Sequence, residues 1–273
     1  MTINCKGNLI DLTTPKVMGI LNVTPDSFFD GGKYKNENDI LSQTAKMLND
    51  GATFIDIGAY SSKPGAKEVS EAEELQRIIP VIELLVRNFP EIIISVDSFR
   101  SEVVKQSIEA GAALVNDISG GVLDANMFDV VAKLQVPYIM MHMQGRPQNM
   151  QLNPVYDDIV KEVILFFASQ LVKLRELKVN DVIIDVGFGF GKTTEHNYEL
   201  LKKLSLFESL EVPILTGVSR KSMLYKLLDI SPEKALNATT VANTIALLNG
   251  TSILRVHDVK EAVEAVKIVN QLS

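Results

Sequence analysis

Eight short apolar segments alternate along the chain with stretches that have helical periodicity. The apolar segments are rich in β-branched side chains and are bounded by turn residues, which is typical of strands. Most are apolar on both faces, as buried parallel strands are. The pattern predicts strands at residues 17–21, 54–57, 92–96, 114–115, 138–141, 182–184, 213–216 and 253–256.

The stretches that follow these strands predict helices. Residues 70–87, for example, begin with Ser70 and Glu73, a Ser-x-x-Glu pattern that marks the first turn of a helix. The expected helices span residues 39–49, 70–87, 101–110, 126–134, 157–177, 197–210, 234–248 and 258–271.

The fold class follows from this alternation, because a helix is the usual crossover between two parallel strands. Eight such units in 273 residues fit an α/β fold, a (β/α)8 TIM barrel, better than a doubly wound open sheet, which is the alternative. No Pro/Ser-rich linker or change of composition divides the chain. The sequence therefore favours one barrel domain over residues 1–273.

Charge and cysteine content narrow the class of protein. The chain has 27 basic and 34 acidic residues, a net charge of −7, which disfavours a broad surface for nucleic acid or an anionic membrane. A few local cations could still hold a small anionic substrate. The single cysteine, Cys5, cannot form an internal disulfide, and no run approaches the roughly 18 apolar residues of a membrane span. We expect a cytoplasmic protein.

Polar residues follow nearly every expected strand. The carboxyl ends of barrel strands meet at one mouth, where barrel enzymes carry their sites. A single polar residue there could be a loop cap, but repetition from strand to strand favours a site. The residues are Asn22; Ser61, Ser62 and Lys63; Asp97; Asn116 and Asp117; His142; Asp185; Ser219, Arg220 and Lys221; and Arg255 with His257.

The residue types suggest two kinds of ligand. The acceptors Asp97 and Asp185 with the amide Asn116 suit a flat heterocycle that has adjacent N–H groups, such as a 2-amino-4-oxopyrimidine. Lys221 could donate to the carbonyl or a nitrogen of such a ring. Arg255, with His257 and the start of the last helix, could hold a phosphate-type anion.

Two other features have structural alternatives. The Gly187–Thr193 stretch ends like a phosphate loop, but that motif needs glycine at position 186, which is Val186. The glycines are better explained by a sharp turn or by close approach to a ligand. Phe190 within it is either core or a wall that stacks on a ring. His142 could be a general base, although a structural role is the simpler interpretation.

Seven segments of the chain share their order and spacing with one known family. They are residues 19–28 (Gly-Ile-Leu-Asn-Val-Thr-Pro-Asp-Ser-Phe), 58–65 (Gly-Ala-Tyr-Ser-Ser-Lys-Pro-Gly), 95–98, 115–120, 185–189, 217–222 and 255–257. From Val17 to the C-terminus, the chain resembles bacterial dihydropteroate synthase, a pterin-binding enzyme. The resemblance implies that 6-hydroxymethyl-7,8-dihydropterin diphosphate and 4-aminobenzoate are condensed to 7,8-dihydropteroate and diphosphate. It also implies Mg²⁺ as cofactor, a homodimer formed through the last helices, and inhibition by sulfonamides.

The resemblance also implies roles for individual residues. The catalytic residues would be Asp97, Asp185 and Lys221. The pterin pocket would comprise Asp97, Asn116, Ile118, Met140, Asp185, Gly217 and Lys221. The diphosphate would lie against Asn22, Arg255 and His257, with Asn22 also contacting Mg²⁺. The aminobenzoate site would comprise Ser62, Lys63, Pro64, Phe190 and Ser222.

One departure and three alternatives remain. The family commonly has Arg where this chain has Lys63, and a point charge on a flexible stem does not reproduce a planar bidentate fork. A related barrel that moves methyl groups from a folate to a corrinoid would share the pterin pocket. A pterin-binding protein without catalysis would not need Asn22, Arg255 and His257 together. Lys221 could instead form a Schiff base, as in barrel aldolases.

Overall fold

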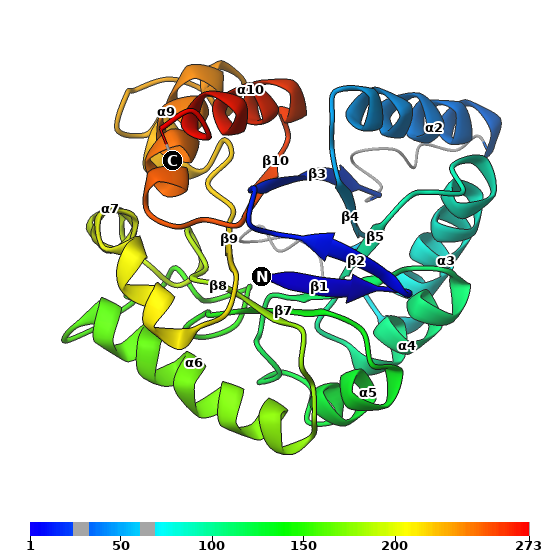
Figure 1. Cartoon of the computed structure of the whole chain (residues 1–273), viewed down its shortest axis with the longest axis horizontal. Coiled ribbons are helices and arrows are strands. Elements are labelled where there is room, and N and C mark those ends of the chain that lie inside the picture. Colours follow the sequence, from blue (N-terminus) through cyan, green and yellow to red (C-terminus); the bar gives the residue numbers. More distant parts are fainter. Residues whose placement is uncertain (24–32, 61–68, 273) are drawn as a thin grey trace.

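Eight parallel strands close into a barrel in a computed structural model that describes residues 1–23, 33–60 and 69–272. The strand order around the barrel is β10-β3-β4-β5-β6-β7-β8-β9, so each strand lies beside its neighbour in sequence and the last pairs with the first (Figure 1). This confirms the predicted TIM barrel and excludes the open sheet. The strands are β3 (Lys16–Asn22), β4 (Phe54–Gly58), β5 (Ile94–Asp97), β6 (Leu114–Asp117), β7 (Tyr138–Met141), β8 (Val182–Asp185), β9 (Ile214–Thr216) and β10 (Ile253–Val256).

Helices surround the barrel (Figure 1). They are α2 (Lys33–Asn49), α3 (Glu71–Asn88), α4 (Ser101–Ala110), α5 (Met127–Leu134), α6 (Ile159–Glu176), α7 (Thr194–Lys202), α8 (Ser222–Tyr225), α9 (Leu236–Leu248) and α10 (Val259–Val269), with 3-10 turns η1 (Leu204–Leu210) and η2 (Pro232–Lys234). No helix in these described ranges is long and apolar enough to cross a membrane.

Helix starts follow local capping chemistry. Ser70 accepts the backbone N–H of Glu73 at 3.2 Å, as predicted, but the Glu73 carboxylate pairs with Arg77. The expected helix at 197–210 instead begins at residue 194 and breaks into α7 and η1. Its start is set by Thr193, which forms a capping box with His196.

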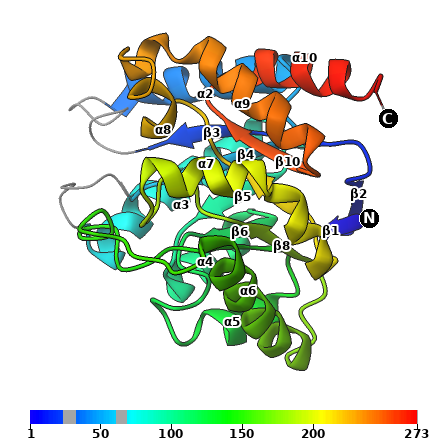
Figure 2. The same cartoon turned by 90° about the vertical axis from the view of Figure 1, so that its left-hand side faces the viewer.

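A hairpin that the sequence analysis did not predict lies at the amino end of the barrel. Strands β1 (Thr2–Cys5) and β2 (Asn8–Asp11) pair antiparallel, and they lie at one end of the molecule in Figure 2. Ile3 and Cys5 face inward and are almost fully buried, together with Leu12 just beyond the hairpin. The hairpin therefore closes that end of the barrel with apolar side chains.

The alternating directions of strand side chains divide the core in two. One set points outward and packs against the helices, as Ile55, Ile57 and Val96 do. The other set points into the barrel and packs on the hairpin. This inner apolar floor consists of Met18, Phe54, Leu114, Ile139, Ile183, Leu215 and Ile253.

Candidate active site

A polar layer lies directly above the apolar floor of the barrel. Side chains two residues apart on a strand point to the same side, so the residue two positions after each floor residue also points into the barrel. Asp56 thus follows Phe54, Asn116 follows Leu114, Asp185 follows Ile183 and Arg255 follows Ile253. Parallel pairing sets Asp97 beside Asn116 and Gly58. Chemistry-bearing side chains from five strands therefore converge on the interior of the carboxyl end.

Arg255 is the centre of a hydrogen-bonded network in this layer. Its Nε donates to Asp56 Oδ2 at 2.6 Å, and its Nη2 donates to Asp97 Oδ2 at 2.8 Å. Asn116 Nδ2 also donates to Asp56 Oδ2, at 3.0 Å. Asp56 is fully buried, so its charge is compensated by Arg255. The network fixes the positions of Asp97, Asn116 and Arg255 relative to one another.

The network leaves acceptor atoms for a ligand. The Asn116 amide donates to Asp56, so its Oδ1 points elsewhere. Asp185 Oδ1 accepts the backbone N–H of Gly187 at 2.8 Å, which leaves Oδ2. Within the described part of the chain, no hydrogen bond engages Asn116 Oδ1, Asp97 Oδ1 or Asp185 Oδ2. Three acceptors from neighbouring strands suit the N–H edge of a flat heterocycle.

Lys221 approaches the same space from the loop after β9. A Cβ atom at Gly217 would lie 3.8 Å from Lys221 Nζ and 3.9 Å from Asp185 Oδ2. Both groups therefore reach the bare backbone at Gly217. Lys221 Nζ also donates to the carbonyl of Phe188 and lies 4.8 Å from the centre of the Phe190 ring. Asp185, Gly217, Lys221 and Phe190 are thus brought together.

Burial shifts the ionisation of these groups. It raises the pKa of Asp97 to about 7, although Arg255 acts in the opposite direction. It also raises the pKa of Asp185, against the effect of Lys221. Burial lowers the pKa of Lys221 to about 8, with Asp185 opposing the shift. Asp97 and Lys221 therefore titrate near neutral pH, which is common in active sites.

Four polar residues lie at the rim. Asn22 is exposed at the end of β3, opposite Gly58 in the strand register. Ser219 Oγ lies 3.0 Å from His257 Nδ1 and accepts the His257 backbone N–H, which orients the imidazole. Arg220, in contrast, forms two hydrogen bonds to Asp258 and two to backbone carbonyls. These four hydrogen bonds hold the loop after β9 against Asp258 and the segment around η2.

The two residues predicted as apolar walls of the pterin pocket, Ile118 and Met140, differ in the direction of their side chains. Ile118 is buried just beyond β6 and has the same strand parity as Asn116. Met140 belongs to the outer core between barrel and helices, because its neighbour Ile139 is the one that faces the interior. Met141 has the inward parity and pairs with Asp185. Met141, not Met140, therefore has the direction of a pocket wall.

The aminobenzoate residues are partly described. Ser62, Lys63 and Pro64 lie outside the described residues. Ser222 is half-buried at the first position of α8, directly after Lys221. Phe190 is half-buried beside the Lys221 ammonium. The two described members therefore flank the lysine that also reaches Asp185.

Asp56 is the residue that sequence reasoning missed. It is a carboxylate inside an otherwise apolar strand, Phe-Ile-Asp-Ile-Gly, and it points into the barrel. A single carboxylate within an apolar strand was the feature of the sequence that could have indicated a site residue. Its Oδ1 has no hydrogen-bond partner among the residues that the structure describes. A buried carboxylate of this kind costs free energy and indicates a functional constraint.

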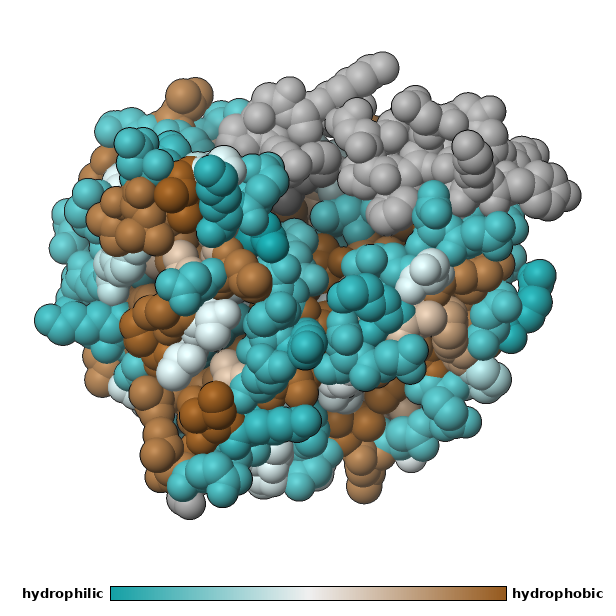
Figure 3. All heavy atoms as spheres, turned by 90° about the horizontal axis from the view of Figure 1, so that it is seen from above, coloured by the Kyte–Doolittle hydropathy of each residue, from teal (hydrophilic) through white to brown (hydrophobic). Residues whose placement is uncertain are grey.

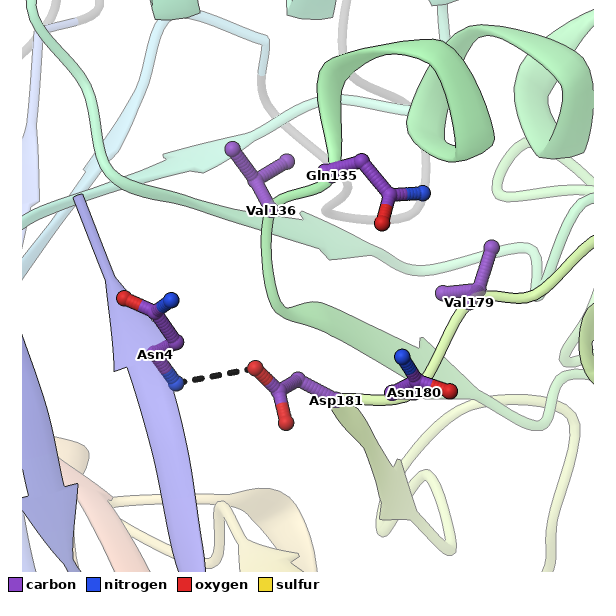
Figure 4. Close-up of a pocket in the computed structure, with 6 residues that line it drawn as sticks. All are labelled: Asn4, Gln135, Val136, Val179, Asn180 and Asp181. Carbon is purple, nitrogen blue, oxygen red and sulfur yellow. Dashed lines mark hydrogen bonds between the residues drawn. The ribbon is translucent and has the colours of Figure 1, made fainter. Parts of the chain in front are cut away.

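A surface pocket at the other end of the barrel has a different character. It has a volume of about 150 Å³ and lies between β1 and the segments that precede β7 and β8 (Figure 4). Asp181 there accepts the backbone N–H of Asn4 at 2.8 Å. Its lining residues are Asn4, Gln135, Val136, Val179, Asn180 and Asp181. It contains none of the inward-facing cations or carboxylates of the polar layer, so the candidate site remains the carboxyl end.

Comparison with known proteins supports the same interpretation. A family model described as pterin binding enzyme matches residues 18–257. Dihydropteroate synthase of Escherichia coli (strain K12) is 44% identical over 98% of this chain and 95% of its own length.

Solved structures agree with these sequence matches. Yersinia pestis dihydropteroate synthase in complex with a sulfonamide drug superposes with a TM-score of 0.93 at 44% identity, over 100% of this chain and 99% of its own. The Xanthomonas albilineans enzyme with 4-aminobenzoic acid gives 0.91 at 38%, over 99% and 97%. The resemblance found in the sequence is therefore confirmed. The chain belongs to the dihydropteroate synthase family of pterin-binding enzymes, which are transferases of folate biosynthesis.

Proposed function

We propose that this chain joins the exocyclic carbon of 6-hydroxymethyl-7,8-dihydropterin diphosphate to the amine of 4-aminobenzoate. The observation that carries the proposal is the set of three unengaged acceptors, on Asp97, Asn116 and Asp185, around a space that Lys221 also reaches. The 2-amino-4-oxopyrimidine edge of a pterin offers the matching N–H donors and a carbonyl. The 4-aminobenzoic acid bound by the Xanthomonas relative supports the second substrate.

The pterin would bind on the polar layer, with Asp185 and Asn116 accepting its N–H groups. Lys221 would donate to the ring carbonyl or to a ring nitrogen. Gly217 leaves room for the flat ring, since a side chain there would meet Lys221, Arg255 and Asp185. Ile118 and Met141 would supply apolar walls. These contacts orient the exocyclic carbon toward the mouth of the barrel.

The diphosphate would lie at the rim, against Asn22, Arg255 and His257. No group of three His, Cys, Asp or Glu side chains within the described residues could hold a metal ion. The donors present fit a Mg²⁺ ion that arrives with the diphosphate, because Mg²⁺ commonly takes one or two protein ligands and several phosphate oxygens. The amide oxygen of Asn22 would be that protein ligand. Bound Mg²⁺ would neutralise negative charge on the diphosphate.

The reaction then requires positioning more than a strong base. The C–O bond to the diphosphate breaks, and the electron pair leaves with the diphosphate. The positive charge that develops on the exocyclic carbon spreads into the pterin ring. Asp97, ionised beside Arg255, would stabilise that charge in a site with little water. The neutral aryl amine forms the new C–N bond and releases a proton.

The aminobenzoate would bind above the pterin, between Phe190 and the start of α8. The Phe190 ring offers a flat apolar face, and its cation–π contact with the Lys221 ammonium keeps that face beside the pterin pocket. Ser222 would contribute a hydroxyl. The predicted contributions of Ser62, Lys63 and Pro64 remain part of this proposal. Sulfonamides, which resemble aminobenzoate in shape, would compete for the same place.

Turnover tests the proposal directly. Purified protein is mixed with Mg²⁺, the pterin diphosphate and 4-aminobenzoate, and diphosphate release and 7,8-dihydropteroate are both measured. We expect stoichiometric formation of the two products, with release that depends on aminobenzoate. Transfer of a methyl group from a methylfolate to a corrinoid would favour the methyltransferase alternative. Pterin binding without any product would favour a protein that only binds pterins. Trapping of Lys221 by borohydride would support the Schiff base.

We also propose a homodimer formed through α9 and α10. Exposed apolar side chains gather on these helices, namely Val241, Ile245, Leu248 and Ile268. Figure 3 faces this side of the molecule, and apolar surface is concentrated in its left half. An apolar patch on one side of a barrel is typical of a subunit interface.

Light scattering should give twice the chain mass of 30.1 kDa. Leu248→Glu should yield the monomer, whereas Leu9→Glu on the hairpin should leave the dimer unchanged. A monomer for the unaltered chain would contradict the proposal.

A further inference from the structure

A lysine is buried behind the glycine-rich loop that joins β8 to α7. Lys192 is 3% exposed. Its Nζ donates to the carbonyl of Phe190 at 2.9 Å and to the carbonyl of His142 at 3.1 Å, and it lies 3.1 Å from His142 Nδ1. The proposed reaction does not use Lys192, because its amine is engaged by these three partners.

The three contacts set the chemistry of both side chains. When Lys192 is protonated it has only N–H donors, so His142 Nδ1 then accepts and the imidazole is neutral. Burial, together with the nearby Lys192 charge, lowers the pKa of His142 to about 2, which excludes it as a general base near neutral pH. Burial lowers the pKa of Lys192 to about 7, with Asp185 opposing and Lys221 adding to the shift. His142 therefore has the structural role that the sequence favoured.

Burying an ammonium is expensive, and an apolar side chain of similar length would fill the same space. Lys192 therefore lowers the stability of the fold unless its hydrogen bonds have a function that an apolar side chain could not fulfil. They connect the end of β7 to a loop that approaches it closely at a glycine. Gly187 has a φ of +72°, and a Cβ atom there would lie 2.0 Å from the His142 carbonyl. The ammonium donates to that same carbonyl.

Four successive carbonyls of the loop, at residues 188–191, each accept a hydrogen bond from a different side chain. Lys221 donates to Phe188, Gln151 to Gly189, Lys192 to Phe190 and Tyr156 to Gly191. Of these contacts, the one from Lys192 controls the backbone of the residue whose ring lies beside the Lys221 ammonium. Among the described residues, Lys192 donates no hydrogen bond to Asp97, Asn116 or Asp185, although its charge acts on Asp185. A change at Lys192 should therefore move the Phe190 ring more than the polar layer.

We propose that Lys192 is a positioning residue that holds the Phe190 wall of the aminobenzoate site through the carbonyls of Phe190 and His142. The inference rests on the proposed function, since it assigns a role within that reaction. It predicts an effect on the second substrate that is separate from the effect on the pterin. A purely structural lysine would change stability or both substrates alike.

The test compares Lys192→Met, which keeps the length but removes every donor, with Lys192→Gln, which keeps one N–H₂ donor. Lys202→Met, at an exposed position on α7, is the matched control. Folding is verified by thermal unfolding, and KM for each substrate and kcat are measured. We expect KM for aminobenzoate to rise about fivefold or more in Lys192→Met and less in Lys192→Gln, while KM for the pterin diphosphate stays within about twofold.

Other results would contradict either the role of Lys192 or the proposed function. If Lys192→Met does not fold, Lys192→Gln carries the comparison with the same expected split between substrates. Unchanged KM values in a folded variant, or equal rises for both substrates, would overturn the role of Lys192. An unaltered enzyme that forms no dihydropteroate would contradict the proposed function, and the inference would fail with it. The Lys202→Met control should match the unaltered enzyme.

Discussion

In the described part of the chain, several ionisable side chains share the interior of the barrel mouth, namely Asp56, Asp97, Asp185, Lys221 and Arg255. Taking one such ion out of water costs several kcal/mol unless it is paired. Arg255 compensates Asp56 and Asp97 through hydrogen bonds, and these two carboxylates raise the pKa of Arg255 although burial alone would lower it. Asp185 has the weaker compensation, from Lys221 and the Gly187 N–H. Its remaining oxygen is the one best prepared to accept from a ligand.

Asp185→Asn should therefore impair the reaction. The change removes a charged acceptor from a buried pocket and presents an N–H₂ group to the N–H edge of the pterin. We expect a loss of at least about 2 kcal/mol in kcat/KM for the pterin diphosphate. Steady-state kinetics measures it, with Asp39→Asn on the exposed face of α2 as control. Full activity of Asp185→Asn would remove Asp185 from the pocket.

The pH dependence should reflect two residues. The reaction needs Asp97 ionised, and its pKa is raised to about 7, so activity should fall as pH drops below that value. It also needs Lys221 protonated, and its pKa is lowered to about 8, so activity should fall as pH rises above that value. We expect a bell-shaped profile of kcat/KM with its maximum between the two. A profile that is flat from pH 6 to pH 9 would contradict these roles.

At the scale of elements, the β1–β2 hairpin supports the site from below. Ile3 is 2% exposed and completes the inner apolar floor, whereas Leu9 on the same hairpin is 72% exposed. Ile3→Ser should lower the free energy of unfolding by about 2–4 kcal/mol, through lost burial and a buried hydroxyl. Leu9→Ser should change it little. Thermal or urea unfolding measures both, and equal stabilities would show that the hairpin does not seal the barrel.

The sequence predicted the repeating elements well because each has its own local signal. Apolar runs located all eight barrel strands, and the observed strands include polar residues that the sequence placed at the strand ends, as with Asp97 and Asp185. The hairpin was missed because its strands have four residues each, too few for a periodicity to stand out. Its turn has Lys6 in the left-handed region, with a φ of 53°. A lysine in the sequence does not indicate that conformation.

The site was predicted only in part for a related reason. Residue type and strand end located Asp97, Asn116, Asp185, Lys221 and Arg255 on different strands or loops. Which atoms remain for a ligand depends on partners far away in sequence, and the Asp56–Arg255 contact spans 199 positions. The direction of Met140 depended on strand parity, which two adjacent methionines cannot reveal.

At the scale of the whole molecule, a protein with a net charge of −7 has to bind an anionic substrate. The charges at the mouth of the barrel decide whether it can. The mouth is not simply cationic, because Arg255 is bound by two carboxylates and Arg220 by Asp258. Among the residues that the structure describes, these two arginines therefore offer a diphosphate little unmatched positive charge. The positive charge of a Mg²⁺ ion that arrives with the diphosphate is therefore important for binding.

Removal of Mg²⁺ should thus weaken binding selectively. Titration calorimetry in EDTA should show pterin diphosphate affinity reduced at least about tenfold, because phosphate charge then lacks its counterion. The affinity of 6-hydroxymethylpterin, which has no phosphate, should stay the same. Equal affinities for the diphosphate with and without Mg²⁺ would contradict the proposed rim site at Asn22.

A crystal structure of the chain with 7,8-dihydropteroate tests the polar layer most directly. We expect the pterin N–H groups about 3 Å from Asn116 Oδ1 and Asp185 Oδ2, with the aminobenzoyl ring against Phe190. The Arg255 contacts to Asp56 and Asp97 should be retained. A pterin ring bound elsewhere, or one that leaves Asn116 and Asp185 without contact, would contradict the assignment of this layer as the active site.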